Sequence, residues 1–239
     1  MSEQSLVAGV ANFRDVGGLA AGQARTRSGI LFRSGNLARV APEGRASLQT
    51  MRLRRVIDLR DDEEVAFAPS AGIDDVETIR MPLFLGSVAS FFERDITLAE
   101  LYASIVDDSA DRVVGVVRAV VADQPVLVHC TAGKDRTGIT VALTLLAAGV
   151  DTEAVVGDYA RTETLLSPQR NRDVLARIRA VHPESLHAEE LATRSPAPVM
   201  RDVIAGITAR FGSPVDYLRA HGLTDDELVE LRRVLLDRP

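Results

Sequence analysis

The sequence is poor in several residue types that mark particular classes of protein. Its 239 residues include one cysteine, no tryptophan and only 4% aromatic residues. A single cysteine excludes a disulfide framework within the chain and suits a reducing environment. No run approaches the roughly 18 uninterrupted apolar residues of a membrane-spanning helix, so we expect no membrane span.

Lysine is almost absent, and arginine supplies nearly all of the positive charge. Among the 28 basic residues, Lys134 is the only lysine. The net charge of −6 argues against non-specific binding to nucleic acid, although it leaves room for local basic patches. With 46% hydrophobic and 26% charged residues, the chain has the composition of a globular protein that can bury a large core.

Targeting and metal-binding signals are also missing. Residues 1–6 have neither a basic region nor a long apolar stretch, so we expect no secretory signal peptide. We therefore expect a cytoplasmic protein, with secretion by a route that needs no signal peptide left open. His182, His187 and His221 lack the spacing of metal ligands, so no metal is expected.

The only cysteine and the only lysine lie together in residues 126–138, which read VLVHCTAGKDRTG. The apolar residues 125–128 predict a buried strand, and the apolar run after Gly138 predicts a helix. The turn between them contains glycine, so its backbone N–H groups can converge on an anion at the start of that helix. Five residues separate Cys130 from Arg136, which lets the sulfur lie beneath an anion that the arginine grips with two nitrogens.

This arrangement predicts a reactive cysteine. In such a positive field we expect the sulfur of Cys130 to be a thiolate at neutral pH. A thiolate beneath a bound anion suits nucleophilic attack on a phosphate ester. The alternative is a buried, inert cysteine in an ordinary turn between a strand and a helix.

The motif His-Cys-x5-Arg-Thr-Gly at residues 129–138 resembles the phosphate-binding loop (P-loop) of cysteine-dependent tyrosine phosphatases. It is most similar to the loop of a bacterial branch that includes mycobacterial enzymes. The resemblance implies an α/β fold of the protein tyrosine phosphatase type, with a central, mostly parallel sheet flanked by helices. It also implies a phosphocysteine intermediate on Cys130, stabilised by Arg136 and the loop amides, with no cofactor.

The resemblance extends to the other residues of the loop. Thr137 is expected to donate a hydrogen bond to the sulfur and so ease its departure in the second step. His129 is expected to organise the loop rather than to act as a base. The residues expected to bind phosphate are Thr131, Ala132, Gly133, Lys134, Asp135 and Arg136.

A carboxylic acid must protonate the leaving group, and two residues compete for this role. Asp58 ends a predicted strand and resembles the acidic Asp-Leu-Arg position of related phosphatases. Asp135 lies inside the loop, where the bacterial branch also has an aspartate. We favour Asp135 and keep Asp58 as the alternative.

Residues 55–60, RVIDLR, predict a strand that ends in charge. Ligand sites in open α/β sheets lie beyond the carboxyl ends of parallel strands, so Asp58 and Arg60 should lie at the same edge as Cys130. The acidic residues 61–64 that follow are expected to be solvent-exposed in the first turn of a short helix.

Two N-terminal segments also carry polar residues beside turns. Residues 12–18, NFRDVGG, contain paired glycines that mark a turn, and residues 29–34 predict a strand. From these residues alone, a local turn network is the simpler interpretation. The pattern Asn-Phe-Arg-Asp followed by Phe-Arg-Ser is, however, similar to the same bacterial phosphatases. This resemblance implies that Asn12, Arg14 and Asp15 support the phosphate-binding loop.

Residues 84–107 gather most of the few aromatic residues into a segment with helical periodicity. Two interpretations fit, namely an ordinary core helix and a mobile lid that excludes water from the site. The bacterial phosphatases carry a helical lid at a comparable place, which favours a lid inserted into the domain.

Periodicity also predicts the remaining elements. Helices are expected at residues 42–54, 112–122, 137–148, 151–164, 168–181, 198–211, 214–221 and 225–237, a strand at 76–83 and a loop at 183–198. No repeat and no strong break divides the chain, so we expect one phosphatase domain over residues 1–239.

The two positively charged side chains of the loop indicate which substrates it could bind. Lys134 and Arg136 place two positive charges within three residues, which is more than one phosphotyrosine needs. Basic residues at this place recur in phosphoinositide phosphatases. The resemblance therefore implies dual specificity, for phosphorylated proteins (phosphotyrosine, with phosphoserine or phosphothreonine) and for phosphoinositides, the latter with transient contact to a membrane surface.

Other functions fit the motif less well. A catalytically silent module that recognises phosphoproteins would keep the loop, but it would not need Cys130, Arg136 and Thr137 together. A sulfur transferase or an arsenate reductase also uses a reactive cysteine. An arsenate reductase usually needs further cysteines, which this chain lacks.

Overall fold

The computed structural model of the protein describes residues 5–83 and 89–237. Its centre is a five-stranded sheet with the strand order β1-β4-β7-β5-β6. In that order the strands are β1 (Arg14–Asp15), β4 (Leu31–Ser34), β7 (Val126–His129), β5 (Arg55–Asp58) and β6 (Glu77–Arg80). Only β1 is antiparallel to its neighbour, so the expected mostly parallel sheet is confirmed.

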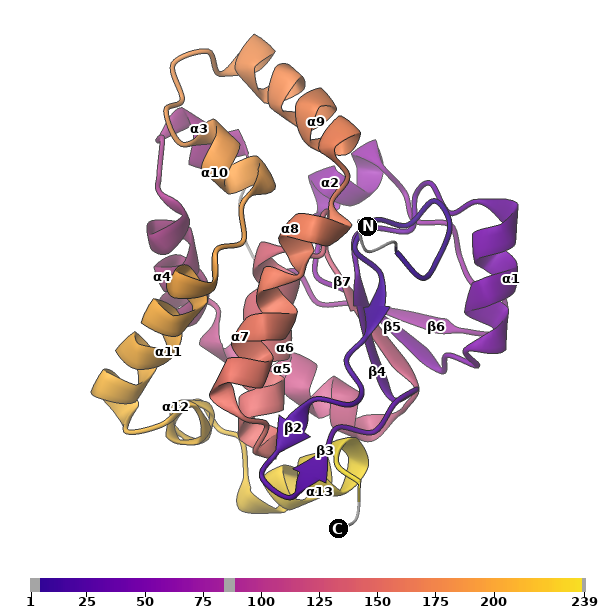
Figure 1. Ribbon diagram of the computed structural model, residues 1–239, viewed down its shortest axis with the longest axis vertical. Helices are drawn as coiled ribbons and strands as arrows, with labels where there is room; N and C mark the ends of the chain where they lie inside the picture. Colours follow the sequence, from indigo (N-terminus) through magenta and orange to yellow (C-terminus); the bar gives the residue numbers. More distant parts are fainter. Residues whose placement is uncertain (1–4, 84–88, 238–239) are drawn as a thin grey trace.

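Helices surround the sheet, and a short hairpin of β2 (Ala20–Ala21) and β3 (Ala24–Arg25) lies at one end of the molecule, near α13 (Figure 1). The helices of the first half are α1 (Pro42–Thr50), α2 (Asp62–Phe67), α3 (Ala89–Glu93), α4 (Leu98–Asp108) and α5 (Ala110–Ala122). Those of the second half are α6 (Asp135–Ala148), α7 (Thr152–Ala160), α8 (Thr162–Leu165), α9 (Pro168–Val181), α10 (Ala188–Thr193), α11 (Ala197–Phe211), α12 (Pro214–Ala220) and α13 (Asp225–Leu235).

Alternate residues of the central strands enter hydrophobic cores on opposite faces of the sheet, as the two-residue period of a strand requires. Phe32, Val56 and Leu127 belong to the smaller core, to which α1 contributes Leu48. Their neighbours in the strands belong to the larger core: Leu31, Ile57, Val126 and Val128. Buried on both faces, these strands have the near-continuous apolar sequence seen in the chain.

The helix α6 lies at the centre of the larger core and packs against β4 and β7. It also contacts α4, α5, α7, α12 and α13, and nearly all of its side chains are buried. The hydroxyls of Thr140 and Thr144 donate to carbonyls one turn back, which satisfies polar groups that no water reaches. Gly149 ends the helix in the left-handed conformation with φ of 99°, as expected for a glycine after a helix.

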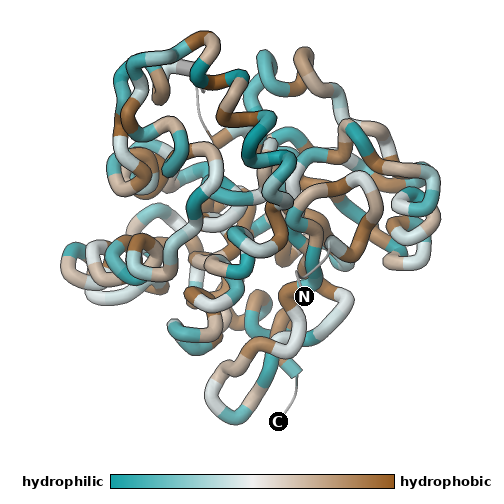
Figure 2. Tube along the Cα trace, turned by 45° about the horizontal axis from the view of Figure 1, so that its top comes forward, coloured by the Kyte–Doolittle hydropathy of each residue, from teal (hydrophilic) through white to brown (hydrophobic). Residues whose placement is uncertain are grey.

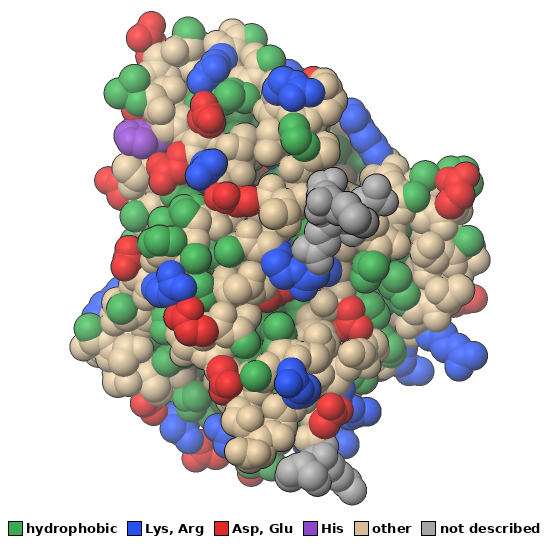
Figure 3. Space-filling model, viewed as in Figure 1, with side chains coloured by type: hydrophobic (Ala, Val, Ile, Leu, Met, Phe, Trp, Pro, Cys, Tyr) green, Lys and Arg blue, Asp and Glu red, His purple; other side chains and the backbone are tan. Residues whose placement is uncertain are grey.

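The outer helices alternate between hydrophilic and hydrophobic residues along their length (Figure 2). On the face shown in Figure 3, basic and acidic side chains are interspersed rather than segregated by sign. No helix within residues 5–83 and 89–237 is both long and apolar enough to cross a membrane.

Most of the expected helices are present, with differences at their ends. The helix expected at 151–164 is split into α7 and α8, and the helix expected at 42–54 ends at Thr50. The expectation of a loop throughout 183–198 is wrong, because α10 lies within it. Its six residues are too few to show a helical period, but they bury Ala188 and Leu191.

The segment expected to form a lid, residues 84–107, divides into three parts. Residues 84–88 lie outside the described residues, and α3 follows them as a short helix. The third part, α4, is a core helix, because Leu101, Tyr102 and Ile105 are buried in the larger core. The apolar face that suggested a lid therefore packs against the rest of the domain.

Truncation of a core side chain on α4 tests this placement. We expect Leu101→Ala to lower the free energy of unfolding by about 2–5 kcal/mol, because it removes buried methyl groups and leaves a cavity. The matched control is Leu186→Ala, at a side chain that is 86% exposed. Urea denaturation of both variants measures the difference. A loss for Leu101→Ala as small as that of the control would contradict the core placement.

Candidate active site

The loop of residues 130–134 connects the end of β7 to the start of α6. The register of the sheet aligns Ser34 and Asp58 with His129, so three strands end together beside Cys130. The expected placement of Asp58 at the same edge as Cys130 is therefore confirmed. Gly133 has φ of 68°, and a Cβ there would lie 2.4 Å from the carbonyl group of Ser34. Only glycine fits at this position.

Three consecutive carbonyls of the loop accept hydrogen bonds from the N-terminal segment. Asn36 donates to the carbonyl of Thr131 through its backbone N–H and its Nδ2, over 3.1 and 3.2 Å. Asn12 Nδ2 lies 3.2 Å from the carbonyl oxygen of Ala132 and 2.8 Å from that of Gly133. In a trans peptide the N–H points opposite to the C=O. The amides of residues 132, 133 and 134 therefore point away from this segment, and they can converge on an anion.

A buried ion-pair network lies behind Asn12. Asp158 on α7 accepts from Arg14 Nε over 2.7 Å and from Arg33 NH1 over 2.8 Å. Arg33 NH2 also donates to the carbonyl of Gly133 over 3.0 Å, while Arg14 donates to Asn12 Oδ1. Burial alone would raise the pKa of Asp158, but the charges of Arg14 and Arg33 hold it below its ordinary value. The network thus reaches the loop through Arg33 and Asn12.

The three residues expected to support the loop therefore differ in whether they reach it. Asn12 contacts the loop directly, and Arg14 reaches it through Asn12. Asp15 instead accepts from the backbone N–H groups of Gly17 and Gly29 over 2.8 and 2.7 Å, in a local turn. The sequence interpretation did not select Arg33 or Asp158 as site residues, although Arg33 lies in the Phe-Arg-Ser pattern of residues 32–34.

Glu64 on α2 binds Arg136 with both carboxylate oxygens, over 2.5 and 2.6 Å. Thr131 donates its hydroxyl to the same carboxylate. Burial would raise the pKa of Glu64, but hydrogen bonds from Arg136 and its charge lower this pKa to about 2. The expectation of a solvent-exposed acidic run is wrong for Glu64. The signal that could have found it is the capping box from Asp61 to Glu64 directly after a strand end.

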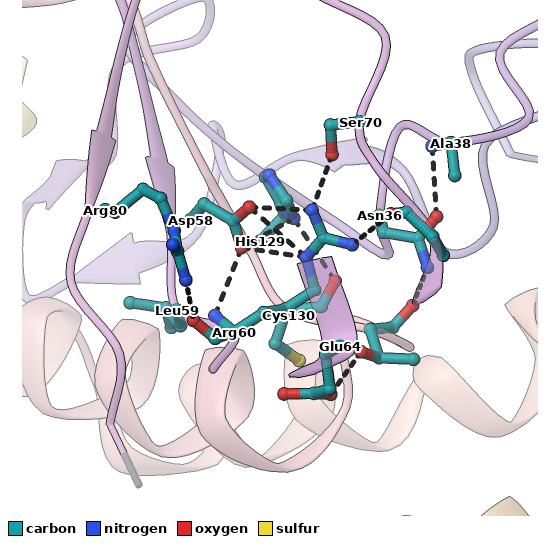
Figure 4. A network of polar contacts seen from close by, with 12 residues as sticks. Asn36, Ala38, Asp58, Leu59, Arg60, Glu64, Ser70, Arg80, His129 and Cys130 are labelled. Atoms are coloured by element: carbon teal, nitrogen blue, oxygen red, sulfur yellow. Dashed lines mark hydrogen bonds and ion pairs between the residues drawn. The ribbon is translucent and has the colours of Figure 1, made fainter. Parts of the chain in front are cut away.

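Asp58 is engaged with Arg60 at the end of β5. The two carboxylate oxygens accept from Arg60 Nε and NH2 over 2.9 and 2.7 Å, and Figure 4 shows this pair beside His129. Burial would raise the pKa of Asp58, but the Arg60 hydrogen bonds and the charges of His129 and Arg60 lower it. Asp58 is therefore ionised at neutral pH, and both of its oxygens already accept hydrogen bonds from the Arg60 guanidinium.

His129 supports the loop from within the protein. Its Nδ1 lies 3.2 Å from the carbonyl oxygen of Cys130, which can only accept a hydrogen bond. Burial lowers the pKa of His129, although the charge of Asp58 raises it. A neutral ring that donates from Nδ1 to the loop backbone fits the expected organising role.

Asp135 is the first residue of α6, and its Oδ1 accepts two hydrogen bonds. Lys134 Nζ lies 2.5 Å from it and the Tyr102 hydroxyl 3.0 Å. Burial and the charge of Asp135 hold the pKa of Tyr102 well above its ordinary value, so this phenol stays protonated and donates. Tyr102 also pairs with the Tyr159 hydroxyl over 2.6 Å. Sequence patterns gave no sign of this contact between α4 and the loop.

Lys134 is buried rather than directed at solvent, with a side chain that is 1% exposed. Besides Asp135, its ammonium group donates to the carbonyl of Arg194 over 2.9 Å. Thr137 is also buried, and its hydroxyl has no hydrogen-bond partner among the described residues. Within the same residues, no group of three His, Cys, Asp or Glu side chains could hold a metal ion.

Known proteins resemble this chain over most of its length. A family model described as the tyrosine phosphatase family matches residues 6–237. The triple specificity protein phosphatase PtpB of Mycobacterium tuberculosis is 31% identical over 95% of this chain and 97% of its own length. A relative in Cupriavidus necator, named among the tyrosine-protein phosphatases, is 32% identical over 71% of this chain and 66% of its own length.

One solved structure gives a weaker likeness. The crystal structure of TpbA from P. aeruginosa matches with a TM-score of 0.37 and 22% identity, over 76% of this chain and 90% of that one.

Removal of the Asp158 charge tests the network behind the loop. We expect Asp158→Asn to lower the free energy of unfolding by about 3–5 kcal/mol, because it leaves Arg14 and Arg33 buried without their carboxylate. The matched control is Glu153→Gln, on the same helix, whose pair with Arg201 is exposed and should contribute almost nothing. Equal losses in urea denaturation of the two variants would contradict a role for the buried network.

The same variant has a predicted pH dependence. Folding lowers the pKa of the Asp158 carboxyl. The contribution of Asp158 to the free energy of unfolding is therefore complete at a pH above its pKa in the unfolded chain. It is lost as the pH falls through its pKa in the folded protein. The difference in stability between wild type and Asp158→Asn should therefore shrink as the pH falls below about 4. A difference that stays constant down to pH 2 would contradict the ionised pair.

Proposed function

The chain belongs to the tyrosine phosphatase family, and from this premise we propose that Cys130 attacks the phosphorus of a phosphate monoester in line. The S–P bond forms as the P–O bond to the leaving group breaks, giving a phosphocysteine. Water then attacks the phosphorus, releasing phosphate and the thiolate. The observation that carries this proposal is that the carbonyls of residues 131–133 accept hydrogen bonds from the N-terminal segment. The next three amides therefore face the opposite side, where they can bind one anion beside Cys130.

Arg136 and these amides stabilise the charge on the equatorial oxygens in both steps. Glu64 holds the guanidinium by two nitrogens, which fixes its plane before substrate binds. Thr137 lies in the first turn of α6, and its hydroxyl, which has no partner within residues 5–83 and 89–237, is available to donate to the departing sulfur.

Asp135, rather than Asp58, supplies the proton to the leaving group. Asp58 binds Arg60 with both oxygens, so neither oxygen is left to face a leaving group. In Asp135 the two donors Lys134 and Tyr102 both occupy Oδ1. Oδ2 is therefore the oxygen of Asp135 that can face the leaving group.

The substrate class is phosphotyrosine in proteins, with a breadth that includes phosphoserine, phosphothreonine and phosphoinositides. Support for the breadth comes from the relative named a triple specificity protein phosphatase. Lys134 supports it less than its sequence position suggested, because the ammonium group is bound to Asp135 and to the carbonyl of Arg194. A silent phosphate-binding module is the second candidate, and activity measurements separate the two.

Removal of the thiol tests the reaction. We expect Cys130→Ser to lower the hydrolysis of an aryl phosphate by at least roughly 1,000-fold, because the serine hydroxyl is not ionised at neutral pH. Urea denaturation of the same variant checks that it folds. A wild-type protein that binds phosphotyrosine but releases no phosphate would favour the silent module instead.

The choice of general acid is tested with two leaving groups. For Asp135→Asn we expect kcat/KM to fall roughly 100-fold or more with phenyl phosphate, a poor leaving group, and far less with p-nitrophenyl phosphate. Asp58→Asn is the comparison, and it should lower both rates in the same proportion, since it disturbs only Arg60 and His129. The opposite pattern would assign the acid to Asp58.

A further inference from the structure

A cavity of about 580 Å³ opens beside the phosphate-binding loop, between the loop and α9. Thr131 and Glu64 line the side nearest the catalytic residues. Across from them α9 contributes Arg170 and Arg177 to the lining, and Arg39 lies at the wall formed by the N-terminal segment. The one carboxylate among the described lining residues, Glu64, is already paired with Arg136.

In the part of the chain that the structure describes, the arginines of this cavity have no acidic partner. Among the described residues, no carboxylate lies within 4 Å of the guanidinium nitrogens of Arg39, Arg170 or Arg177, although the chain carries a net charge of −6. Arg170 NH1 donates to Asn171 Oδ1 over 2.9 Å and to the carbonyl of Ala192 over 3.1 Å. Its NH2 and Nε have no hydrogen-bond partner within the same part of the chain.

The electrostatics around Arg170 connect it to the catalytic residues. Burial lowers the pKa of Arg170, the charges of Asp135 and Cys130 raise it, and Arg177 lowers it again. Arg170 therefore lies within the field of the nucleophile and of the proposed acid, and the two guanidinium groups on α9 repel each other. An anion bound between them would remove that repulsion.

The same face of α9 also carries apolar side chains. Residues 170, 174, 177, 178 and 181 recur at helical spacing and line the cavity together. No side chain of α9 is fully buried, so this face is not part of either core. Arg172 lies on another side of the helix, where it lines a different depression. The cavity thus offers cations near the loop and an apolar wall beyond it.

We infer that Arg170 and Arg177 form a second anion site, which binds another phosphate of the substrate while the scissile phosphate lies in the loop. The chemical class that fits is an inositol headgroup bearing two or more phosphates, with the apolar wall facing the rest of a phosphoinositide. From the sequence, Lys134 was expected to bind such an additional phosphate, but its ammonium group binds Asp135 instead. The inference rests on the proposed phosphatase activity and specifies its substrate.

The test compares one ratio in four proteins, namely kcat/KM for soluble dioctanoyl phosphatidylinositol bisphosphate divided by kcat/KM for p-nitrophenyl phosphate. We expect this ratio to fall roughly 10-fold in Arg170→Gln and in Arg177→Gln, because each loses a charged hydrogen bond to the second phosphate. Arg177→Lys should recover part of it. Arg172→Gln removes the same charge from the same helix and should leave the ratio unchanged.

The results distinguish failure of the second anion site from failure of the phosphatase activity. A ratio unchanged in both variants, or an equal fall in Arg172→Gln, overturns the second anion site. The soluble inositol bisphosphate headgroup should show the same fall; a fall with the lipid alone means that the arginines do not hold a phosphate. A selective loss confined to a doubly phosphorylated peptide overturns the lipid assignment. Wild-type protein that hydrolyses none of these substrates refutes the phosphatase activity itself.

Discussion

The site depends on hydrogen bonds that hold three consecutive carbonyls of the loop toward the N-terminal segment. Without such hydrogen bonds, the peptide groups of a loop can rotate and turn their N–H groups toward water instead of toward an anion. Here Asn12, Asn36 and Arg33 bind the carbonyls of residues 131–133 and thereby orient the amides on the opposite side. The site is thus built by a segment about 100 residues away in the sequence.

This constraint needs buried charge, which is costly unless each charge is paired. Asp158 forms ion pairs with two arginines, whereas Glu64 and Asp58 each bind a single arginine with both carboxylate oxygens. In every pair the carboxylate has a lowered pKa, so acid should weaken these ion pairs together. The pairs also give the loop a defined position relative to β5 and α7, which would preorganise the proposed anion site.

The strands, the central helix and the loop were predictable because their signals are local. A short apolar run, a glycine-bearing turn and a buried helix follow one another within about 25 residues, and neighbouring side chains decide each of them. The sequence interpretation erred where a side chain's partner lies far away. Glu64 looked like one of four solvent-exposed acids, although its carboxylate binds Arg136 on α6.

The sequence by itself determined the proposed nucleophile, the cation proposed to act with it and the order of strand, loop and helix that holds them. These follow from spacing, since Cys130 and Arg136 lie in one continuous turn. Only the tertiary structure decided what Lys134 and Asp135 do, because their partners, Tyr102 and Arg194, come from distant helices and loops. The same holds for the arginines of α9. Charge and spacing are properties of a sequence, but which opposite charge a side chain meets depends on how the chain folds.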